Sequence, residues 1–248
     1  MAPVTLYFHG LPGSAAELAS FGPDIAARAR RFHVAPRGGD FAQLANRIAA
    51  RFPDGPFVLV GFSLGAAAAL QVAPHLGERV ARIDLVSPAA PLQLGDYLGG
   101  MAGAPVFRAA LAGAVPFAAL TIVQAQVARF APAKLAAALM AKAKGEDRAL
   151  AADPQFIAAL AKSLRHSLLA DRAAYMAEIR AYVCDWRAGL ARVHQPVSIR
   201  QGSEDDWTPP AMADALAKAL PDCTGLQMEP GLSHFSTLRA YLEGQPPA

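Results

Sequence analysis

The sequence predicts an α/β protein with a mostly parallel sheet of about six strands, flanked by helices and interrupted by an inserted helical cap. Short apolar runs alternate with helical patterns over residues 1–90 and again over residues 187–248. Such alternation is typical of the βαβ units that build a parallel sheet. Residues 91–186 are instead rich in alanine and leucine and keep a helical period throughout. We therefore expect a core formed by residues 1–90 and 187–248 and a cap formed by residues 91–186.

Six short apolar runs are the strand candidates. Each has the length of a short strand, and turn-forming residues separate it from the neighbouring helical pattern. In chain order they are Val4–Phe8, His33–Ala35, Phe57–Val60, Ile83–Val86, Val197–Arg200 and Leu226–Met228.

Helical patterns lie between these strands. Asp40 is a good N-cap for a helix that places Leu44, Ile48 and Phe52 on one face. The other core helices are expected over Ala15–Arg31, with a break near Gly22-Pro23, and over Leu64–Leu76, Pro210–Leu220 and Phe235–Leu242.

The inserted segment is expected to form several helices. Asp153-Pro154 is a start signal, because an N-cap residue precedes a proline at the first helical position. Apolar residues then recur every four positions and predict one buried face. Breaks between helices are expected at Pro105, Pro116, Pro132, Gly145 and Pro154.

Composition excludes several classes of protein. Hydrophobic residues make up 54% of the 248 residues, which argues against disorder. The net charge is +3 and no run of Lys or Arg occurs, which argues against a nucleic-acid partner. The two cysteines, Cys184 and Cys223, lie far apart and suggest no disulfide framework. A strand pattern begins at Val4 without a basic and apolar leader, so we expect a cytoplasmic location.

The segment between Arg108 and Arg129 raises the question of a membrane, because its twenty residues carry no charge. A membrane span prefers about 20 strongly apolar residues. Much of this segment is alanine, and it also contains Gly113, Pro116 and two glutamines. We therefore expect no stable membrane span. A helix pair covering an apolar pocket is the favoured interpretation, and interfacial membrane contact is the alternative.

A serine on a sharp turn is the strongest functional signal. Gly61-Phe62-Ser63-Leu64-Gly65 lies between a predicted strand and a predicted helix, which is the context of a nucleophile elbow. Gly61 and Gly65 remove side chains that would collide where strand and helix nearly touch. The turn lifts the Ser63 hydroxyl clear of the sheet at a helix N-terminus, where negative charge is favoured.

A general base and an orienting acid follow later in the chain. A serine hydroxyl is a weak nucleophile and needs both groups. Asp205 and His234 each lie just after the carboxyl end of a predicted strand, where open α/β sheets gather their ligands. The order Ser63, Asp205, His234 differs from that of chymotrypsin or subtilisin. Glu204 and Asp206 are alternatives to Asp205 as the acid, and a solvated acidic turn is the structural alternative.

These motifs resemble the α/β-hydrolase fold, in its capped, single-domain form. The resemblance spans nearly all of residues 3–243 and is carried by four motifs in the expected order: His9–Gly13, Gly61–Gly65, Gly202–Pro209 and Gly231–Phe235. It implies that Asp205, three residues after its glycine, is the acid. It also implies an oxyanion hole formed by the backbone N–H groups of Leu11 and Leu64. His9 would hold the loop that contains Leu11.

The sequence departs from this family at its start. Such enzymes commonly have a β-hairpin before the strand that precedes the His-Gly loop, whereas here that strand begins at Val4. We therefore expect six strands rather than eight. The sheet edge exposed in this way could be covered by a partner subunit in a homodimer.

The remaining histidines indicate no further chemistry. His33, His75, His166 and His194 have neither a motif context nor the spacing of metal ligands. We expect no metal and no cofactor.

The sequence therefore predicts a serine hydrolase that forms an acyl-enzyme on Ser63. We expect the substrate to be a small ester or thioester with an apolar acyl or alcohol part, because the cap is rich in Leu, Ala, Phe, Met and Val. The same three residues also serve C–C bond hydrolysis, lyase or perhydrolase chemistry in similar folds. A ligand-binding module without catalysis is the third alternative. Trp186 and Trp207 flank the acid loop, where each could pack or line the pocket.

Overall fold

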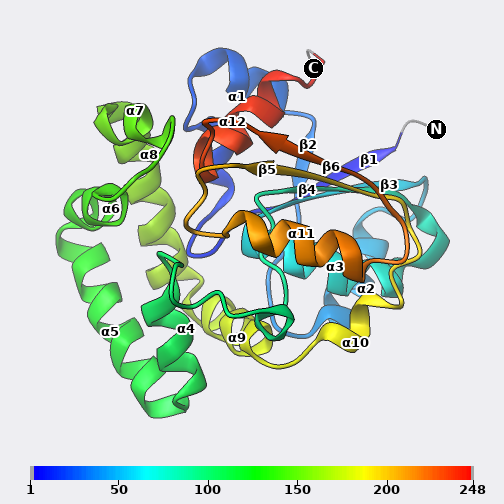
Figure 1. Cartoon of the computed structure of the whole chain (residues 1–248), viewed down its shortest axis with the longest axis horizontal. Helices are drawn as coiled ribbons and strands as arrows, with labels where there is room; N and C mark the ends of the chain where they lie inside the picture. The colour runs from blue at the N-terminus through cyan, green and yellow to red at the C-terminus, as the bar shows by residue number, and fades with distance from the viewer. Residues whose placement is uncertain (1–2, 247–248) are drawn as a thin grey trace.

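A single six-stranded parallel sheet forms the centre of the molecule. The computed structural model describes residues 3–246, and within them the strand order is β2-β1-β3-β4-β5-β6, with every neighbouring pair parallel (Figure 1). The strands are β1 (Val4–Phe8), β2 (Phe32–Val34), β3 (Phe57–Phe62), β4 (Val80–Val86), β5 (Val197–Gly202) and β6 (Cys223–Glu229). The prediction of a six-stranded sheet flanked by helices is confirmed. β1 has its predicted bounds, and β2 begins and ends one residue earlier than predicted. The other four strands are longer than predicted, because they continue through mostly polar or small residues that lack a strand pattern.

Helices cover both faces of the sheet. One face carries α2 (Phe41–Arg51), α3 (Leu64–Leu76) and α11 (Pro210–Ala219), and the other carries α1 (Pro23–Ala29) and α12 (His234–Glu243) (Figure 1). The alternation of β3 shows why: Phe57 and Leu59 join the first layer, whereas Val58 and Val60 join the second. All six residues of β3 are buried, which places this strand at the centre of the core.

Local signals set the helix boundaries of the core. The Asp40 side chain accepts a hydrogen bond from the Gln43 N–H at 3.0 Å, as expected for an N-cap. The predicted helix over 15–31 is a 3₁₀ helix, η1 (Ala15–Ala19), followed by α1, with a break at Gly22 where φ is 99°. The last helix begins at His234, one residue earlier than predicted.

The residues between β4 and β5 are mostly helical, apart from the stretch before α4, which contains only a short 3₁₀ helix, η3 (Leu92–Leu94). They form α4 (Ala104–Leu111), α5 (Ala114–Phe130), α6 (Pro132–Met140), α7 (Asp147–Ala152), α8 (Pro154–Arg165), a π-helical turn (His166–Ala170) and α9 (Arg172–Val183), and α10 (Arg187–Leu190) follows. They form one side of the molecule in Figure 1. The exact division into core and cap stays a prediction.

The predicted helix breaks in this segment are correct with one exception. Asp153 caps α8 by accepting from the Gln155 N–H at 2.8 Å, with Pro154 at the first helical position. Pro132 likewise begins α6. Pro116 instead lies in the first turn of α5, where proline is tolerated because the N–H it lacks would have no partner in the helix. The break occurs at Gly113, whose φ of 122° favours glycine.

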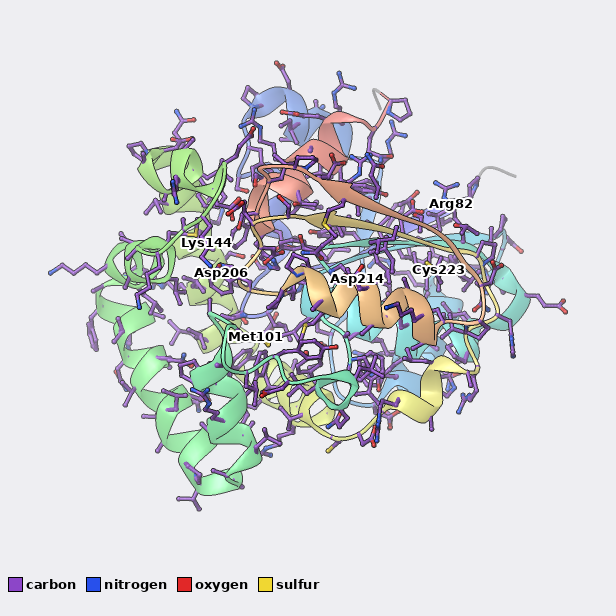
Figure 2. All side chains as sticks on the ribbon, viewed as in Figure 1. Arg82, Met101, Lys144, Asp206, Asp214 and Cys223 are labelled. Carbon is purple, nitrogen blue, oxygen red and sulfur yellow. The ribbon has the colours of Figure 1, made fainter. Side chains whose placement is uncertain are left out.

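Over residues 3–246, no single helix is long and apolar enough to cross a membrane. The helices α5 and α6 pass that test of length and composition only when taken together, and they meet at a bend of 116°. Figure 2 shows the side chains on this ribbon, with Cys223 among those labelled. Cys184 and Cys223 are both free thiols.

Candidate active site

Ser63 occupies a strained turn between β3 and α3. Its φ of 56° and ψ of −127° lie in a sparsely populated region for a residue with a side chain, which costs on the order of 1–3 kcal/mol. The Ser63 N–H donates to the Val86 carbonyl at 3.1 Å, and its own carbonyl accepts from the N–H of Ala89, also at 3.1 Å. A Cβ at Gly65 would overlap the Phe8 carbonyl, and one at Gly61 would overlap the backbone of Ala66. The turn therefore requires both glycines.

Asp205 is the acid that the structure brings to His234. The Asp205 Oδ2 lies 2.9 Å from the His234 Nδ1, and both side chains are almost completely buried. Glu204 is exposed, and Asp206 lies 3.6 Å from the Lys144 ammonium. Of these three acidic side chains, only that of Asp205 is hydrogen-bonded to the imidazole.

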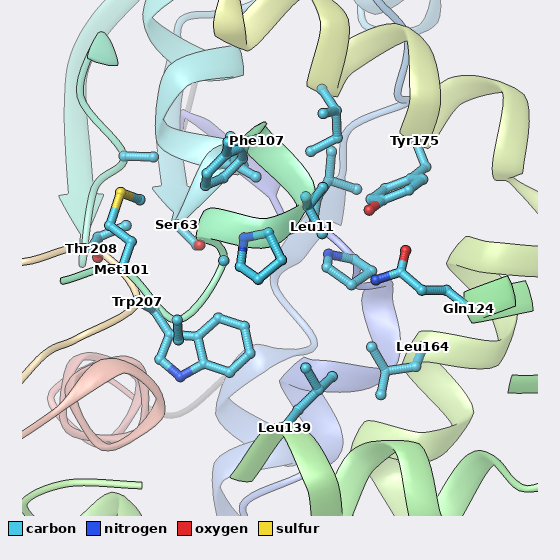
Figure 3. A pocket seen from close by; sticks show the side chains of 18 of the residues that line it. Leu11, Ser63, Met101, Phe107, Gln124, Leu139, Leu164, Tyr175, Trp207 and Thr208 are labelled. Atoms are coloured by element: carbon cyan, nitrogen blue, oxygen red, sulfur yellow. The ribbon is translucent and has the colours of Figure 1, made fainter. Parts of the chain in front are cut away.

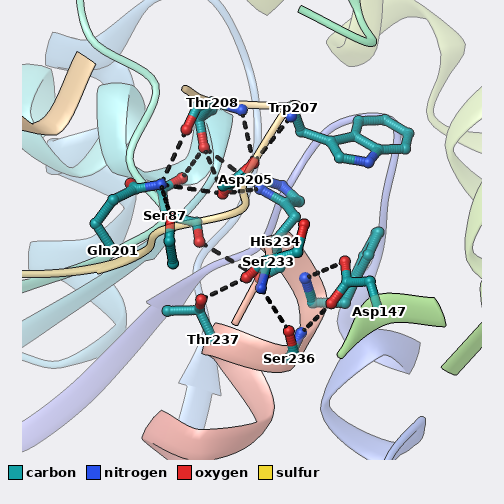
Figure 4. A network of polar contacts seen from close by, with 12 residues as sticks. Ser87, Asp147, Gln201, Asp205, Trp207, Thr208, Ser233, His234, Ser236 and Thr237 are labelled. Carbon is teal, nitrogen blue, oxygen red and sulfur yellow. Dashed lines mark hydrogen bonds and ion pairs between the residues drawn. The ribbon is translucent and has the colours of Figure 1, made fainter. Parts of the chain in front are cut away.

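The carboxylate of Asp205 is held by a cage of donors. The N–H groups of Trp207 and Thr208 each donate to Oδ1 at 2.9 Å, and the Gln201 Nε2 donates to Oδ2 at 3.3 Å. The Thr208 hydroxyl lies 3.0 Å from Oδ2 and 3.3 Å from the His234 Nδ1 (Figure 4). Burial raises the pKa of Asp205, but the imidazole and these donors outweigh it and hold the pKa below its ordinary value. Asp205 is therefore a stable anion that can orient an imidazole.

Aromatic rings fix the imidazole of His234. Trp207 stacks on it with the ring centroids 5.7 Å apart and the planes 18° apart, and Phe62 lies at 4.7 Å. Phe235 meets it edge to face at 5.3 Å. Ser63 and His234 line the same small cavity of about 20 Å³. The structure thus gathers the three sequence-predicted residues at one end of the sheet.

Asp147 supports this histidine from the inserted segment. Its carboxylate accepts from the Phe235 N–H at 3.0 Å and from the Ser236 N–H at 2.7 Å, at the N-terminus of α12 (Figure 4). Negative charge is favourable there. Burial has the largest effect and raises the pKa of Asp147 above its ordinary value, although these donors lower it in part. The sequence analysis did not single out Asp147, because its partners lie 88 and 89 residues away and no local motif links them.

The loop predicted to hold the oxyanion lies directly over Ser63. A Cβ at Gly10 would lie 3.3 Å from the Ser63 Cβ and 3.2 Å from the Phe62 ring, so a larger residue there would be crowded. Leu11 and Leu64 line the same pocket as Ser63, and the Leu11–Pro12 peptide bond is cis. Their backbone N–H groups stay the predicted oxyanion donors.

A buried glutamate anchors this loop. The Glu17 Oε1 accepts from the Gly10 N–H at 3.0 Å and from the Tyr7 hydroxyl at 2.6 Å. Burial raises the pKa of Glu17 to about 7. Glu17 also lines the small cavity that Ser63 and His234 share. No sequence motif identified Glu17 as a site residue, because a glutamate three residues after an N-cap serine indicates only the start of a helix.

His9 holds the same loop from its other side. Its Nδ1–H donates to the Gly10 carbonyl at 2.8 Å, and the Arg37 guanidinium donates to the His9 carbonyl at 2.9 Å. Burial, with Arg37 nearby, lowers the pKa of His9 to about 3, so the ring is neutral. Arg37 in turn forms a buried ion pair with Glu178 of α9. His9 therefore lies where the resemblance implied, as a support of the loop.

An apolar pocket of about 130 Å³ opens from Ser63 between the sheet and the inserted helices (Figure 3). Its walls come from the loop at Leu11, from α4, α5, α6, α8 and α9, and from Trp207. Trp186 is not part of its lining. Among residues 3–246 no group of three or more His, Cys, Asp or Glu is arranged to hold a metal ion.

The strand order together with the serine turn defines an α/β hydrolase, as the sequence motifs implied. Residues 31–237 match the model of a family described as serine aminopeptidase, S33. The chain belongs to this family of α/β hydrolases.

Solved structures of low sequence identity share the fold. The enol-lactonase from Burkholderia xenovorans LB400 is 18% identical with a TM-score of 0.63, and the match covers 98% of this chain and 89% of the lactonase. A thermophilic esterase from Thermogutta terrifontis is 18% identical with a TM-score of 0.63, at 98% and 90% coverage. An esterase from Exiguobacterium antarcticum is 16% identical with a TM-score of 0.59, at 98% and 92% coverage. No curated protein sequence matches significantly.

Proposed function

We propose that this protein is a serine hydrolase that cleaves carboxylic esters or thioesters with an apolar acyl or alcohol part. One observation carries the proposal: the imidazole of His234, bound to Asp205 at 2.9 Å, shares a cavity with the hydroxyl of the strained Ser63. A nucleophile, a base and an orienting acid are the groups that acyl transfer requires.

The reaction would follow two half-reactions. His234 accepts the Ser63 proton as the oxygen attacks the carbonyl carbon, and the N–H groups of Leu11 and Leu64 stabilise the oxyanion. The imidazolium then gives its proton to the leaving alcohol or thiol, which leaves an ester on Ser63. Water, deprotonated by His234, attacks this ester and releases the acid. Asp205 fixes the ring and stabilises its positive charge throughout.

The pocket favours an uncharged substrate. No Asp, Glu, Lys or Arg appears in its lining, which consists of apolar side chains with a few neutral polar ones. An aminopeptidase substrate would bring an α-ammonium group that this lining leaves without a carboxylate partner. Glu17, the carboxylate of the smaller cavity, already accepts from the Gly10 N–H and the Tyr7 hydroxyl. We therefore favour a neutral ester over an amino-terminal peptide bond, with the inserted helices acting as the cap over its apolar part.

Substitution of the nucleophile tests the proposal. Ser63→Ala should lower kcat for p-nitrophenyl butyrate about a million-fold and abolish labelling by a fluorophosphonate probe. Ser198→Ala, a serine on β5 that hydrogen-bonds to Asp84, is the control and should keep both properties. L-leucine p-nitroanilide should be a poor substrate of the unmodified enzyme.

Two outcomes would reject or narrow the proposed function. Most of the esterase activity surviving in Ser63→Ala would show that another group reacts. Labelling of Ser63 without turnover of any simple ester would favour lyase or C–C bond chemistry at the same residues.

A further inference from the structure

The apolar pocket contains two polar atoms that do not belong to the reaction. Tyr175 of α9 and Gln124 of α5 line it together with the hydrocarbon side chains of the inserted segment. Figure 3 shows their polar ends turned toward the pocket, on the opposite side from Ser63. They come from two different helices and converge on one space.

Both atoms lack a partner. The Tyr175 hydroxyl and the Gln124 Oε1 are buried and make no hydrogen bond within residues 3–246. More than about 90% of buried polar groups in proteins are paired. Leaving one unpaired is unfavourable, because the group has given up its hydrogen bonds to water without gaining another. Two such groups at one end of one pocket therefore point to a ligand that pairs with them.

Packing alone does not explain the Tyr175 hydroxyl. The side chain is 1% exposed, and its ring packs against Phe117 with the centroids 6.2 Å apart. A phenylalanine ring would make the same contact without a buried hydroxyl. Tyr182, the neighbouring buried tyrosine of α9, differs in this respect, because its hydroxyl donates to the Ala90 carbonyl at 2.8 Å.

The two atoms define the chemistry of the ligand group. Burial raises the pKa of Tyr175 well above its ordinary value, so the phenol keeps its proton and can donate. The Gln124 Oε1 can only accept. A hydroxyl is the smallest group that accepts from one and donates to the other. A carboxylate or an ammonium would be desolvated there without an opposite charge.

We propose that Tyr175 and Gln124 form a subsite for a neutral hydroxyl on the acyl chain of the substrate, remote from the carbonyl that Ser63 attacks. The preferred ester is then a hydroxyacyl ester rather than a plain alkanoate. This inference rests on the proposed function, since it assigns the substrate of the same pocket.

Matched substrate pairs test the subsite. The measurement is kcat/KM for p-nitrophenyl esters of straight-chain acids with about four to ten carbons, each with and without a terminal hydroxyl. At the chain length that reaches the subsite, the hydroxy ester should be preferred about 10- to 100-fold. Tyr175→Phe should reduce this preference at least about tenfold, because it removes the donor and keeps the ring. Gln124→Met should act in the same direction.

Tyr182→Phe is the matched control and should leave the preference unchanged. The subsite is refuted if plain esters are preferred at every length, or if Tyr175→Phe slows both members of each pair equally, as a structural role would. Failure of the proposed function looks different, because then neither series is turned over and the fluorophosphonate probe leaves Ser63 unlabelled.

Discussion

Two alanine-rich helices, α3 in the core and α5 in the inserted segment, have similar compositions but opposite surroundings. Ten of the 13 residues of α3 are buried, because it packs against β3 and β4 of the sheet and against α2. Only four of the 17 residues of α5 are buried, and Val115 and Phe130 are 80% and 78% exposed. The comparison teaches that the core encloses α3, the helix that follows Ser63, on most sides, whereas α5 buries one side only.

The same division separates the chemistry from the choice of substrate. Ser63, Asp205 and His234 all follow strands of the core, and the predicted oxyanion donors do as well. Most of the pocket wall beyond Ser63 comes from the inserted helices. Changes in the core should therefore affect all substrates alike, and changes in the inserted segment should affect substrates selectively.

The largest expected effect sharpens this division. Asp205→Asn should lower kcat about 10⁴-fold, because an amide cannot hold the imidazole in its reactive tautomer or stabilise its charge. The loss should be equal for butyrate and octanoate esters, measured under saturating substrate. A loss that varies strongly with chain length would mean that Asp205 also shapes the pocket, and the division would fail.

A pH experiment addresses the core loop over Ser63. The folded-state pKa of Glu17 is raised to about 7, above the unfolded value near 4.5. Protonated Glu17 therefore stabilises the folded state. This stabilisation is fully present below about pH 4.5 and is lost as the pH rises through about 7. The loss is at most about 3 kcal/mol. In Glu17→Gln the free energy of unfolding should fall less steeply over this range. Urea denaturation at several pH values measures it.

The exposed Glu146→Gln is the control for that experiment and should keep the original pH slope. If Glu17→Gln keeps the slope as well, Glu17 is ionised throughout, and its burial in the loop is less complete than described.

A matched pair of substitutions tests the two helices directly. Ala68→Leu in α3 should destabilise the protein by about 1–3 kcal/mol, because its surroundings are fully packed. Ala119→Leu in the exposed side of α5 should change stability by no more than about 0.5 kcal/mol. Thermal unfolding of both variants measures the difference. Equal effects would show that α5 is covered in solution.

A last prediction concerns the contact that crosses the division. Asp147 of the inserted segment holds the N-terminus of α12, where His234 begins the helix. Asp147→Asn leaves one acceptor for two N–H groups and should cost about 1–2 kcal/mol of stability. If this contact also positions the imidazole, kcat should fall for all esters alike. A change in chain-length preference instead would place Asp147 with the pocket residues.

Much of the fold could be predicted because its signals are local. The apolar runs of β1 and β3, the N-caps at Asp40 and Asp153, and the glycines around Ser63 each depend on residues a few positions apart. Boundaries were less certain, as the start of β4 at Val80 shows, because polar residues can extend a strand where a neighbour supplies its hydrogen bonds.

The sequence by itself determined the order of the strands along the chain, the turn that bears Ser63, and the placement of Asp205 and His234 after strand ends. These features follow from local periodicity and from backbone sterics. Only the tertiary structure decided which acidic residue meets His234, that Asp147 and Glu17 support the site, and that Tyr175 and Gln124 face one pocket. Those outcomes depend on contacts between residues far apart in the chain, and burial, which sets their energies, exists only once the elements have packed.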